Sequence, residues 1–263
     1  MERLGLFGAI AEFYQQSMDS SCDYGAWADY VINRIKTYSQ GNSGIDAACG
    51  SGQFTRALKK AGFNVCGVDI SEEMLVAAEK ENAANGVFVQ YIKGDLTKLK
   101  FPHKVDFITA INDAFNCLDG ENMKKAFARL NLCLKKGGVL LFDVSSEYKL
   151  KNVIANNVFF EDEDNYAYIW TNKLFDDRVE MELTAFVRRK AFENEIKKVF
   201  GAADKDCELF EKKESALTEY IHTESEIVTA LEKSGFKIVA IEGESGTEKK
   251  PDSERLNFIA LKI

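Results

Sequence analysis

The chain has 263 residues, 46% of them hydrophobic and 29% charged, as is typical of a globular protein with one large domain or a domain plus a smaller one. Its formal net charge of −8 argues against a nucleic-acid partner, because affinity for phosphate backbones depends on clustered lysine and arginine. The apolar run Leu4–Ala11 lacks the length and the basic flank of a membrane or signal segment, so we expect no membrane partner.

The first part of the chain predicts two helices and then a regular alternation of strands and helices. The opening helices cover 4–20 and 24–37 and are expected to pack across the mouth of a ligand crevice. The alternation that follows predicts a parallel, doubly wound α/β sheet. Its expected strands are 44–48, 64–69, 87–92, 105–111 and 139–144, and its helices are 53–61, 72–84 and 121–135.

The hydrophobic period changes after a predicted helix at 146–155. Alternating apolar residues predict a hairpin of strands 166–175 and 179–187. A further strand is expected within 208–222. The acidic run Glu161–Asp164 is interpreted as a solvated loop. We therefore expect residues 156–222 to form a β-rich lid inserted into a domain made of 1–155 and 223–263.

The end of the chain returns to the pattern of the main domain. Thr223 and Glu226 form a capping box, which predicts a helix that ends at Gly235. Two further strands, 236–241 and 256–262, are expected to complete the sheet.

A glycine turn and an acidic residue mark the ends of the first two predicted strands. Gly50 and Gly52 allow the chain to turn sharply into a helix while its backbone comes close to a ligand. Asp69 closes the next strand, 17 residues after Gly52, where a carboxylate can accept hydrogen bonds from a ribose diol. This layout predicts a nucleotide-binding crevice.

Two departures from the dinucleotide pattern bear on which nucleotide binds. The third glycine position is occupied by Thr55, and Asp46 precedes the turn by four residues. A carboxylate there suits an ammonium group better than a pyrophosphate. The amino acid end of S-adenosylmethionine carries such an ammonium.

Taken together, these motifs resemble those of the class I S-adenosylmethionine-dependent methyltransferases. Asp46–Gly52 resembles their glycine loop and Asp69–Leu75 their ribose segment, and later motifs match at Gly94–Leu96, Ile111–Asn116 and Lys135–Val144. The front segment, with Phe13–Tyr14, Asp23–Tyr24 and Trp27, resembles a bacterial subgroup that has a β-rich insertion after the fifth strand. The resemblance implies a Rossmann-like seven-stranded sheet and S-adenosylmethionine as the cofactor.

The resemblance also implies a set of cofactor-binding residues. Asp69 is expected at the ribose, Asp95 at the adenine amino group, and Asn112 near the reactive sulfonium. Ile70 and Met74 are expected to form apolar walls for adenine, while Tyr14 and Trp27 cover the cofactor. The complete expected set is Tyr14, Trp27, Asp46, Ala47, Gly50, Gly52, Asp69, Ile70, Met74, Asp95, Leu96 and Asn112.

The sequence leaves the catalytic residues unassigned but narrows the methyl acceptor. Asn112–Phe115 lacks the Asn/Asp-Pro-Pro-aromatic signature that is used on planar amino groups, and no Pro-Cys pair suggests methylation of a base carbon. The leading interpretation is transfer to a nitrogen or oxygen of a small molecule. We expect the lid to form the walls of the pocket that binds this acceptor, through Tyr166, Trp170 and Arg188. A regulatory protein that binds S-adenosylmethionine without turnover and, less favoured, a nicotinamide-linked dehydrogenase remain as alternatives.

Cysteine and histidine usage bears on metals and on the cellular compartment. The six cysteines include no Cys-x-x-Cys pair, and the chain has only two histidines. We therefore expect no metal site, and reduced core cysteines in a cytoplasmic protein.

Overall fold

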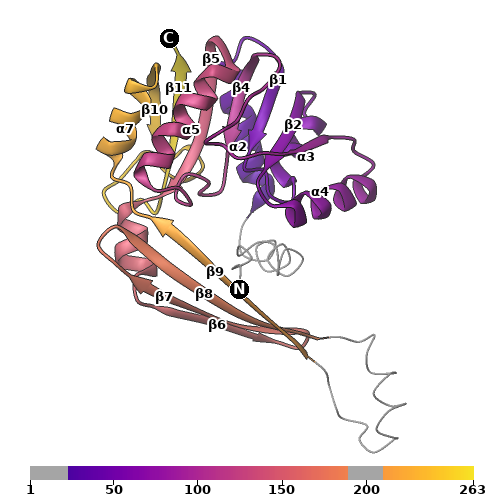
Figure 1. Cartoon of the computed structure of the whole chain (residues 1–263), viewed down its shortest axis with the longest axis vertical. Helices are drawn as coiled ribbons and strands as arrows, with labels where there is room; N and C mark the ends of the chain where they lie inside the picture. Colours follow the sequence, from indigo (N-terminus) through magenta and orange to yellow (C-terminus); the bar gives the residue numbers. More distant parts are fainter. Residues whose placement is uncertain (1–22, 189–209) are drawn as a thin grey trace, which may run out of the picture.

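The protein is built on two β-sheets, seen in a computed structural model that describes residues 23–188 and 210–263 (Figure 1). The predicted helix at 4–20 lies outside the described residues. The larger sheet has seven strands in the order β10-β11-β5-β4-β1-β2-β3. Neighbouring strands among β1 to β5 pair in parallel, and β11 runs antiparallel to both β5 and β10. The strand bounds are β1 Ser43–Ala47, β2 Asn64–Asp69, β3 Gln90–Lys93, β4 Val105–Ala110, β5 Leu134–Ser145, β10 Phe236–Glu242 and β11 Arg255–Lys262.

Helices cover both faces of this sheet. Successive residues of its strands point to opposite faces and are buried on both, so each face needs helices to cover it. In β5, Val139 and Leu141 pack in one cluster with side chains of α2 and α3, whereas Leu140 and Phe142 pack in another with α5 and α7. This two-sided burial confirms the predicted doubly wound α/β fold. The helix bounds are α2 Tyr24–Tyr38, α3 Gln53–Lys60, α4 Glu72–Asn85, α5 Gly120–Cys133 and α7 Glu224–Lys233.

Side-chain caps begin several of these helices where the sequence indicates. The predicted capping box is confirmed at the start of α7. The Thr223 hydroxyl accepts a hydrogen bond from the Glu226 amide, and the Glu226 carboxylate accepts one from the Thr223 amide at 2.8 Å. Ser71 caps α4 and Asp119 caps α5 through their side-chain oxygens. The helix predicted at 146–155 is present as a shorter π-helical segment, η1, from Lys149 to Ile154.

The second sheet is an antiparallel arm that extends away from the main sheet (Figure 1). It comprises β6 Val158–Glu163, β7 Tyr166–Leu174, β8 Arg178–Arg188 and β9 Phe210–Tyr220, paired in that order. The predicted hairpin and the strand within 208–222 are confirmed. The interpretation of Glu161–Asp164 as a loop was wrong for the first three residues, which belong to β6 and pair with β7, whereas Asp164 lies in the turn between the strands. An edge strand tolerates such exposed acidic residues, since only one side of it is paired.

The arm rejoins the main domain at the loop after β4. The amide of Tyr220 donates to the carbonyl of Asn116 at 2.6 Å, and the Asn116 side chain donates back to the carbonyls of Tyr220 and Ser145, each at 3.1 Å. These bonds fix the end of β9 beside the carboxyl ends of the parallel strands. In the described part of the chain, no helix is long and apolar enough to cross a membrane.

Candidate functional site

A cavity of about 450 Å³ lies beyond the carboxyl ends of β1, β2 and β4, the edge at which doubly wound sheets bind ligands. Segments that follow these strands form one part of its wall, and β9 of the arm forms another. Its lining residues in the described chain are Tyr24, Ala48, Cys49, Gly50, Ser51, Gln53, Phe54, Asp69, Ile70, Met74, Gly94, Asp95, Leu96, Ile111, Asn112, Ala114, Cys117, Leu118, Ala216, Leu217, Thr218 and Tyr220.

The two glycines of the turn are required for different reasons. Gly50 lines the cavity with φ of 52°, and a Cβ there would lie 3.1 Å from the Met74 methyl carbon. Gly52, with φ of 76°, is not a lining residue, and a Cβ there would lie 2.1 Å from the Tyr91 hydroxyl. Gly50 therefore keeps the cavity wall free of a side chain, whereas Gly52 lets the turn pack against β3.

Asp69 presents a carboxylate at the cavity wall and orders the glycine turn at the same time. Its two oxygens accept hydrogen bonds from the amides of Gly50, at 2.8 Å, and Ser71, at 2.9 Å. Burial raises the pKa of this carboxyl group, whose residue is 9% exposed. Each carboxylate oxygen has a second lone pair, so the group can also accept hydrogen bonds from a diol.

The predicted adenine segment also lies at the cavity. Ile70, Met74, Asp95 and Leu96 are all lining residues, and Ile70 is 67% exposed. The hydroxyl and amide of Thr97 donate to one oxygen of Asp95 and help to lower the pKa of its carboxyl group. Apolar walls beside an ionised carboxylate fit a ligand with a flat apolar body and a hydrogen-bond donor at its edge.

Asp46 lies beneath the turn and is not a lining residue. Its carboxylate accepts hydrogen bonds from the hydroxyls of Thr55, at 2.5 Å, and Thr109, at 2.8 Å. Burial raises the pKa of Asp46 to about 6, although both hydroxyls act in the opposite direction. Ala47 is likewise buried and outside the lining. The structure thus places Asp46 and Ala47 behind the residues that face the cavity.

Helix α2 closes another side of the cavity through Tyr24. The Tyr24 ring packs on Phe54, which also lines the cavity, with ring centroids 5.8 Å apart. Trp27 packs behind both rings and is not a lining residue. Tyr14, the other predicted aromatic cover, lies outside the described residues.

Strand β9 supplies a part of the wall that sequence reasoning did not assign to individual residues. Ala216, Leu217, Thr218 and Tyr220 line the cavity, whereas Tyr166, Trp170 and Arg188 are not among its lining residues. Trp170 instead packs within the arm, against the cluster around Leu183. A strand was expected within 208–222, but its register against the loop after β4 determines which side chains reach the cavity.

Glu219 lies between two lining residues of β9, Thr218 and Tyr220, but is not itself a lining residue. It is 8% exposed, and its Oε2 has no hydrogen-bond partner in the described chain. Burial, reinforced by the charge of Asp113, raises the pKa of Glu219 to about 8. A carboxyl group in this setting is mostly protonated at neutral pH.

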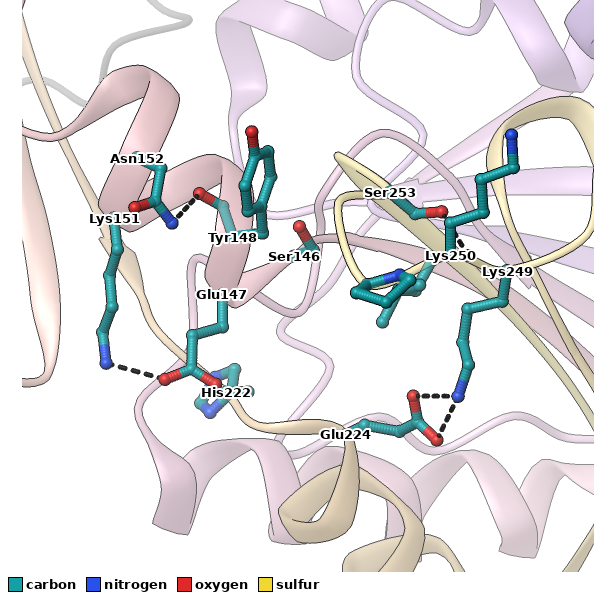
Figure 2. A pocket seen from close by; sticks show the side chains of 12 residues that line it. Ser146, Glu147, Tyr148, Lys151, Asn152, His222, Glu224, Lys249, Lys250 and Ser253 are labelled. Atoms are coloured by element: carbon teal, nitrogen blue, oxygen red, sulfur yellow. Dashed lines mark hydrogen bonds and ion pairs between the residues drawn. The ribbon is translucent and has the colours of Figure 1, made fainter.

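A second cavity, of about 680 Å³, opens where the arm joins the main domain (Figure 2). Its charged side chains largely pair with one another, since Lys151 bonds Glu147 at 2.7 Å and Lys249 bonds Glu224 at 2.8 Å. It contains neither the glycine turn nor Asp69. We therefore place the candidate cofactor site in the first cavity. Across 23–188 and 210–263, no group of three or more metal-ligating side chains comes together.

Comparisons with known proteins agree with the family resemblance found in the sequence. Residues 45–138 match a family model described as a methyltransferase domain. A protein of Geobacillus sp. (strain WCH70), provisionally named a methyltransferase, is 30% identical over 97% of this chain and 99% of its own length.

Solved structures extend the likeness over nearly the whole chain. An S-adenosylmethionine-dependent methyltransferase from Clostridium acetobutylicum is 27% identical, with a TM-score of 0.84 over 96% of this chain and 97% of its own. An amino pentose methyltransferase from Micromonospora echinaspora, solved with S-adenosylmethionine bound, is 18% identical with a TM-score of 0.72, covering 95% of this chain and 97% of its own. The second likeness bears on the fold alone.

Proposed function

Because this chain belongs to the S-adenosylmethionine-dependent methyltransferases, we propose that it methylates a nitrogen or oxygen atom of a small molecule held beneath β9. The observation that carries this proposal is the division of one cavity between the glycine turn with Asp69 and the arm strand with Thr218 and Tyr220. A cofactor on the first part and an acceptor on the second would meet near Asn112.

The described residues fit S-adenosylmethionine better than a dinucleotide. Gly50 leaves room for the methionine portion, Asp69 suits the ribose hydroxyls, and Asp95 suits the adenine amino group. The described lining has carboxylates but neither lysine nor arginine, which favours a cationic ligand over a pyrophosphate. This balance of charge disfavours a nicotinamide cofactor.

Residues outside the lining are assigned supporting roles in the proposal. Asp46 and Thr55 hold the glycine turn from beneath through their 2.5 Å hydrogen bond, and Gly52 lets the turn pack against Tyr91. Ala47 is buried in β1, just before the turn. The negative charge of Asp46 acts on the ammonium group through space rather than by direct contact. Trp27 supports Tyr24 and Phe54, and Tyr14 remains a predicted cover.

Methyl transfer requires the protein mainly to position and enclose the reactants. S-adenosylmethionine supplies a methyl group on a positively charged sulfur, and in-line attack by a lone pair needs alignment more than acid–base catalysis. The apolar side chains Ala114, Leu118, Ala216 and Leu217 exclude water from the acceptor part of the cavity. We assign no catalytic base.

We further propose the domain division expected from the sequence, with 1–155 and 223–263 binding the cofactor and 156–222 serving as a lid. The cavity volume of about 450 Å³ and the net charge of −8 argue for a small-molecule partner rather than a nucleic acid. The cysteines that the structure describes are free thiols, which favours a reducing compartment such as the cytoplasm.

The test is turnover with a panel of small amines and alcohols and tritiated S-adenosylmethionine. We expect S-adenosylhomocysteine and one methylated product to form in equal amounts. Tight cofactor binding without turnover across a broad panel favours the regulatory alternative, and binding of NAD in place of S-adenosylmethionine would contradict the proposal.

A further inference from the structure

The turn that brings Asn112 to the cavity has an unusual backbone. Asn112 and the next residue, Asp113, both have positive φ, at 73° and 62°. Two consecutive non-glycine residues in the left-handed region are disfavoured, so the surrounding structure must hold them there.

Asp143, near the end of β5, provides the first restraint on this turn. Its carboxylate accepts hydrogen bonds from the amides of Asn112, at 2.6 Å, and Asp113, at 3.3 Å. The residue is fully buried, so water does not compete for these bonds. One carboxylate therefore satisfies both amides of the strained turn.

Arg255 of β11 provides the second restraint. Its guanidinium donates to Asp143 and forms a bidentate pair with Asp113, at 2.8 and 3.1 Å. The same group lies over the ring of Trp27, 4.6 Å from the ring centroid. Arg255 of β11 thus contacts the turn, strand β5 and helix α2 at once.

The restrained turn is also part of the cavity wall. Ile111, Asn112 and Ala114 line the cavity, and Asn116 bonds the end of β9 through Tyr220. A change in the turn would therefore move the wall shared by the proposed cofactor and acceptor parts. A purely stabilising role is a weaker explanation of the buried Asp143–Arg255 pair, because the cost of removing both charges from water offsets their attraction.

We propose that Asp143 and Arg255 are positioning residues, which hold the Asn112–Asp113 turn so that Asn112 faces the reactive methyl group of the cofactor. This inference rests on the proposed function. Neither residue lines the cavity, so both act through the turn.

The experiment compares Asp143→Asn and Arg255→Lys with the wild type and with Arg34→Lys. Asparagine keeps the size of Asp143 but leaves one oxygen for two amides, and lysine keeps the charge of Arg255 but loses the fork. Arg34→Lys is the matched control, because Arg34 forms a partly buried ion pair with Glu242 at 2.8 Å, outside the cavity lining. Calorimetry measures S-adenosylmethionine affinity, and carbon NMR of bound [methyl-¹³C]S-adenosylmethionine reports the surroundings of the methyl group.

We expect both test variants to move the methyl resonance and weaken binding about three- to tenfold, as for one lost hydrogen bond, while the control does neither. An unchanged resonance and affinity in folded test variants would overturn the inference, as would the same changes in Arg34→Lys. If Asp143→Asn fails to fold, Arg255→Lys decides the question. A wild type that binds no S-adenosylmethionine instead contradicts the proposed function, and the inference with it.

Discussion

The two parts of the cavity are constructed differently. The proposed cofactor part comes from turns directly after neighbouring parallel strands, between Ala48 and Asn112. The proposed acceptor part depends on β9, which returns to the cavity only after the whole arm has been built. The first can be recognised from spacing along the chain, whereas the second depends on how a distant strand docks. Mutations on the two sides of the cavity should therefore have different effects on cofactor binding and on methyl transfer.

The largest expected effect is at Gly50. Gly50→Val places a branched side chain against the Met74 methyl group and into the cavity, so we expect S-adenosylmethionine affinity to fall at least about 100-fold. Gly62→Val is the control, because Gly62 also has positive φ but a Cβ there meets nothing within 4 Å. Calorimetry should show loss of binding only for Gly50→Val. Equal affinities in the two variants would place the methionine portion elsewhere.

The matching test of the acceptor part is Thr218→Trp. A tryptophan on β9 fills the space beneath the arm, so methyl transfer to an acceptor identified by the panel should fall more than about 30-fold. S-adenosylmethionine affinity should stay within about threefold, which corresponds to less than 1 kcal/mol. Thr171→Trp, at an exposed position of the same arm, is the control. Turnover at the wild-type rate in Thr218→Trp would remove the acceptor from beneath β9.

A smaller loss of affinity is expected for Asp69→Ala. Removing the carboxylate should weaken S-adenosylmethionine binding by about 1.5 to 3 kcal/mol, the contribution of hydrogen bonds to a charged group. Asp106→Ala provides the comparison, since Asp106 also bonds a backbone amide and Lys135 but is not a lining residue. Calorimetry should separate the two, and unchanged affinity in Asp69→Ala contradicts its assignment to the ribose.

A separate expected effect is on the pH dependence of stability rather than on binding. The pKa of Glu219 is about 8 in the folded protein, so the folded state retains a proton that the unfolded state loses near its ordinary pKa of 4.5. Between these values the free energy of unfolding should decrease as pH rises. Glu219→Gln should remove this contribution, so its advantage in stability over the wild type should grow as the pH rises from 4 to 9.

Urea unfolding from pH 4 to 9 measures this difference, with Glu182→Gln, on the exposed face of the arm, as the control. A stability difference between Glu219→Gln and the wild type that does not change with pH would mean that Glu219 is not buried against the loop after β4.

The main sheet could be predicted from the sequence, although local propensity was not always the reason. The segment around Gly44 has little intrinsic preference for a strand, yet β1 lies inside the sheet, between β4 and β2. A Cβ at Gly44 would lie 2.2 Å from the ring of Phe107, so the glycine accommodates a neighbouring aromatic side chain. The repeated alternation of strands and helices identified β1 where its own composition did not.

The candidate site could be predicted in part. Glycine spacing located Gly50 and Asp69 at the cavity, but it did not reveal that Asp46 bonds Thr55 beneath the turn. Thr55 at the third glycine position was the available signal, because a hydroxyl one helical turn into α3 can reach back to the strand. The contribution of β9 depends on the bonds between Asn116 and Tyr220, and no local pattern encodes that docking.

We propose that cofactor and acceptor meet in the cavity between the glycine turn and β9. A crystal structure of the full chain with S-adenosylmethionine would show where the cofactor binds and which way its methyl group points. We expect the ribose hydroxyls within hydrogen-bond distance of Asp69, adenine beside Ile70 and Asp95, and the methyl group directed toward Asn112 and the wall formed by β9. S-adenosylmethionine bound instead in the cavity of Figure 2, or with its methyl group directed away from β9, would contradict this proposal.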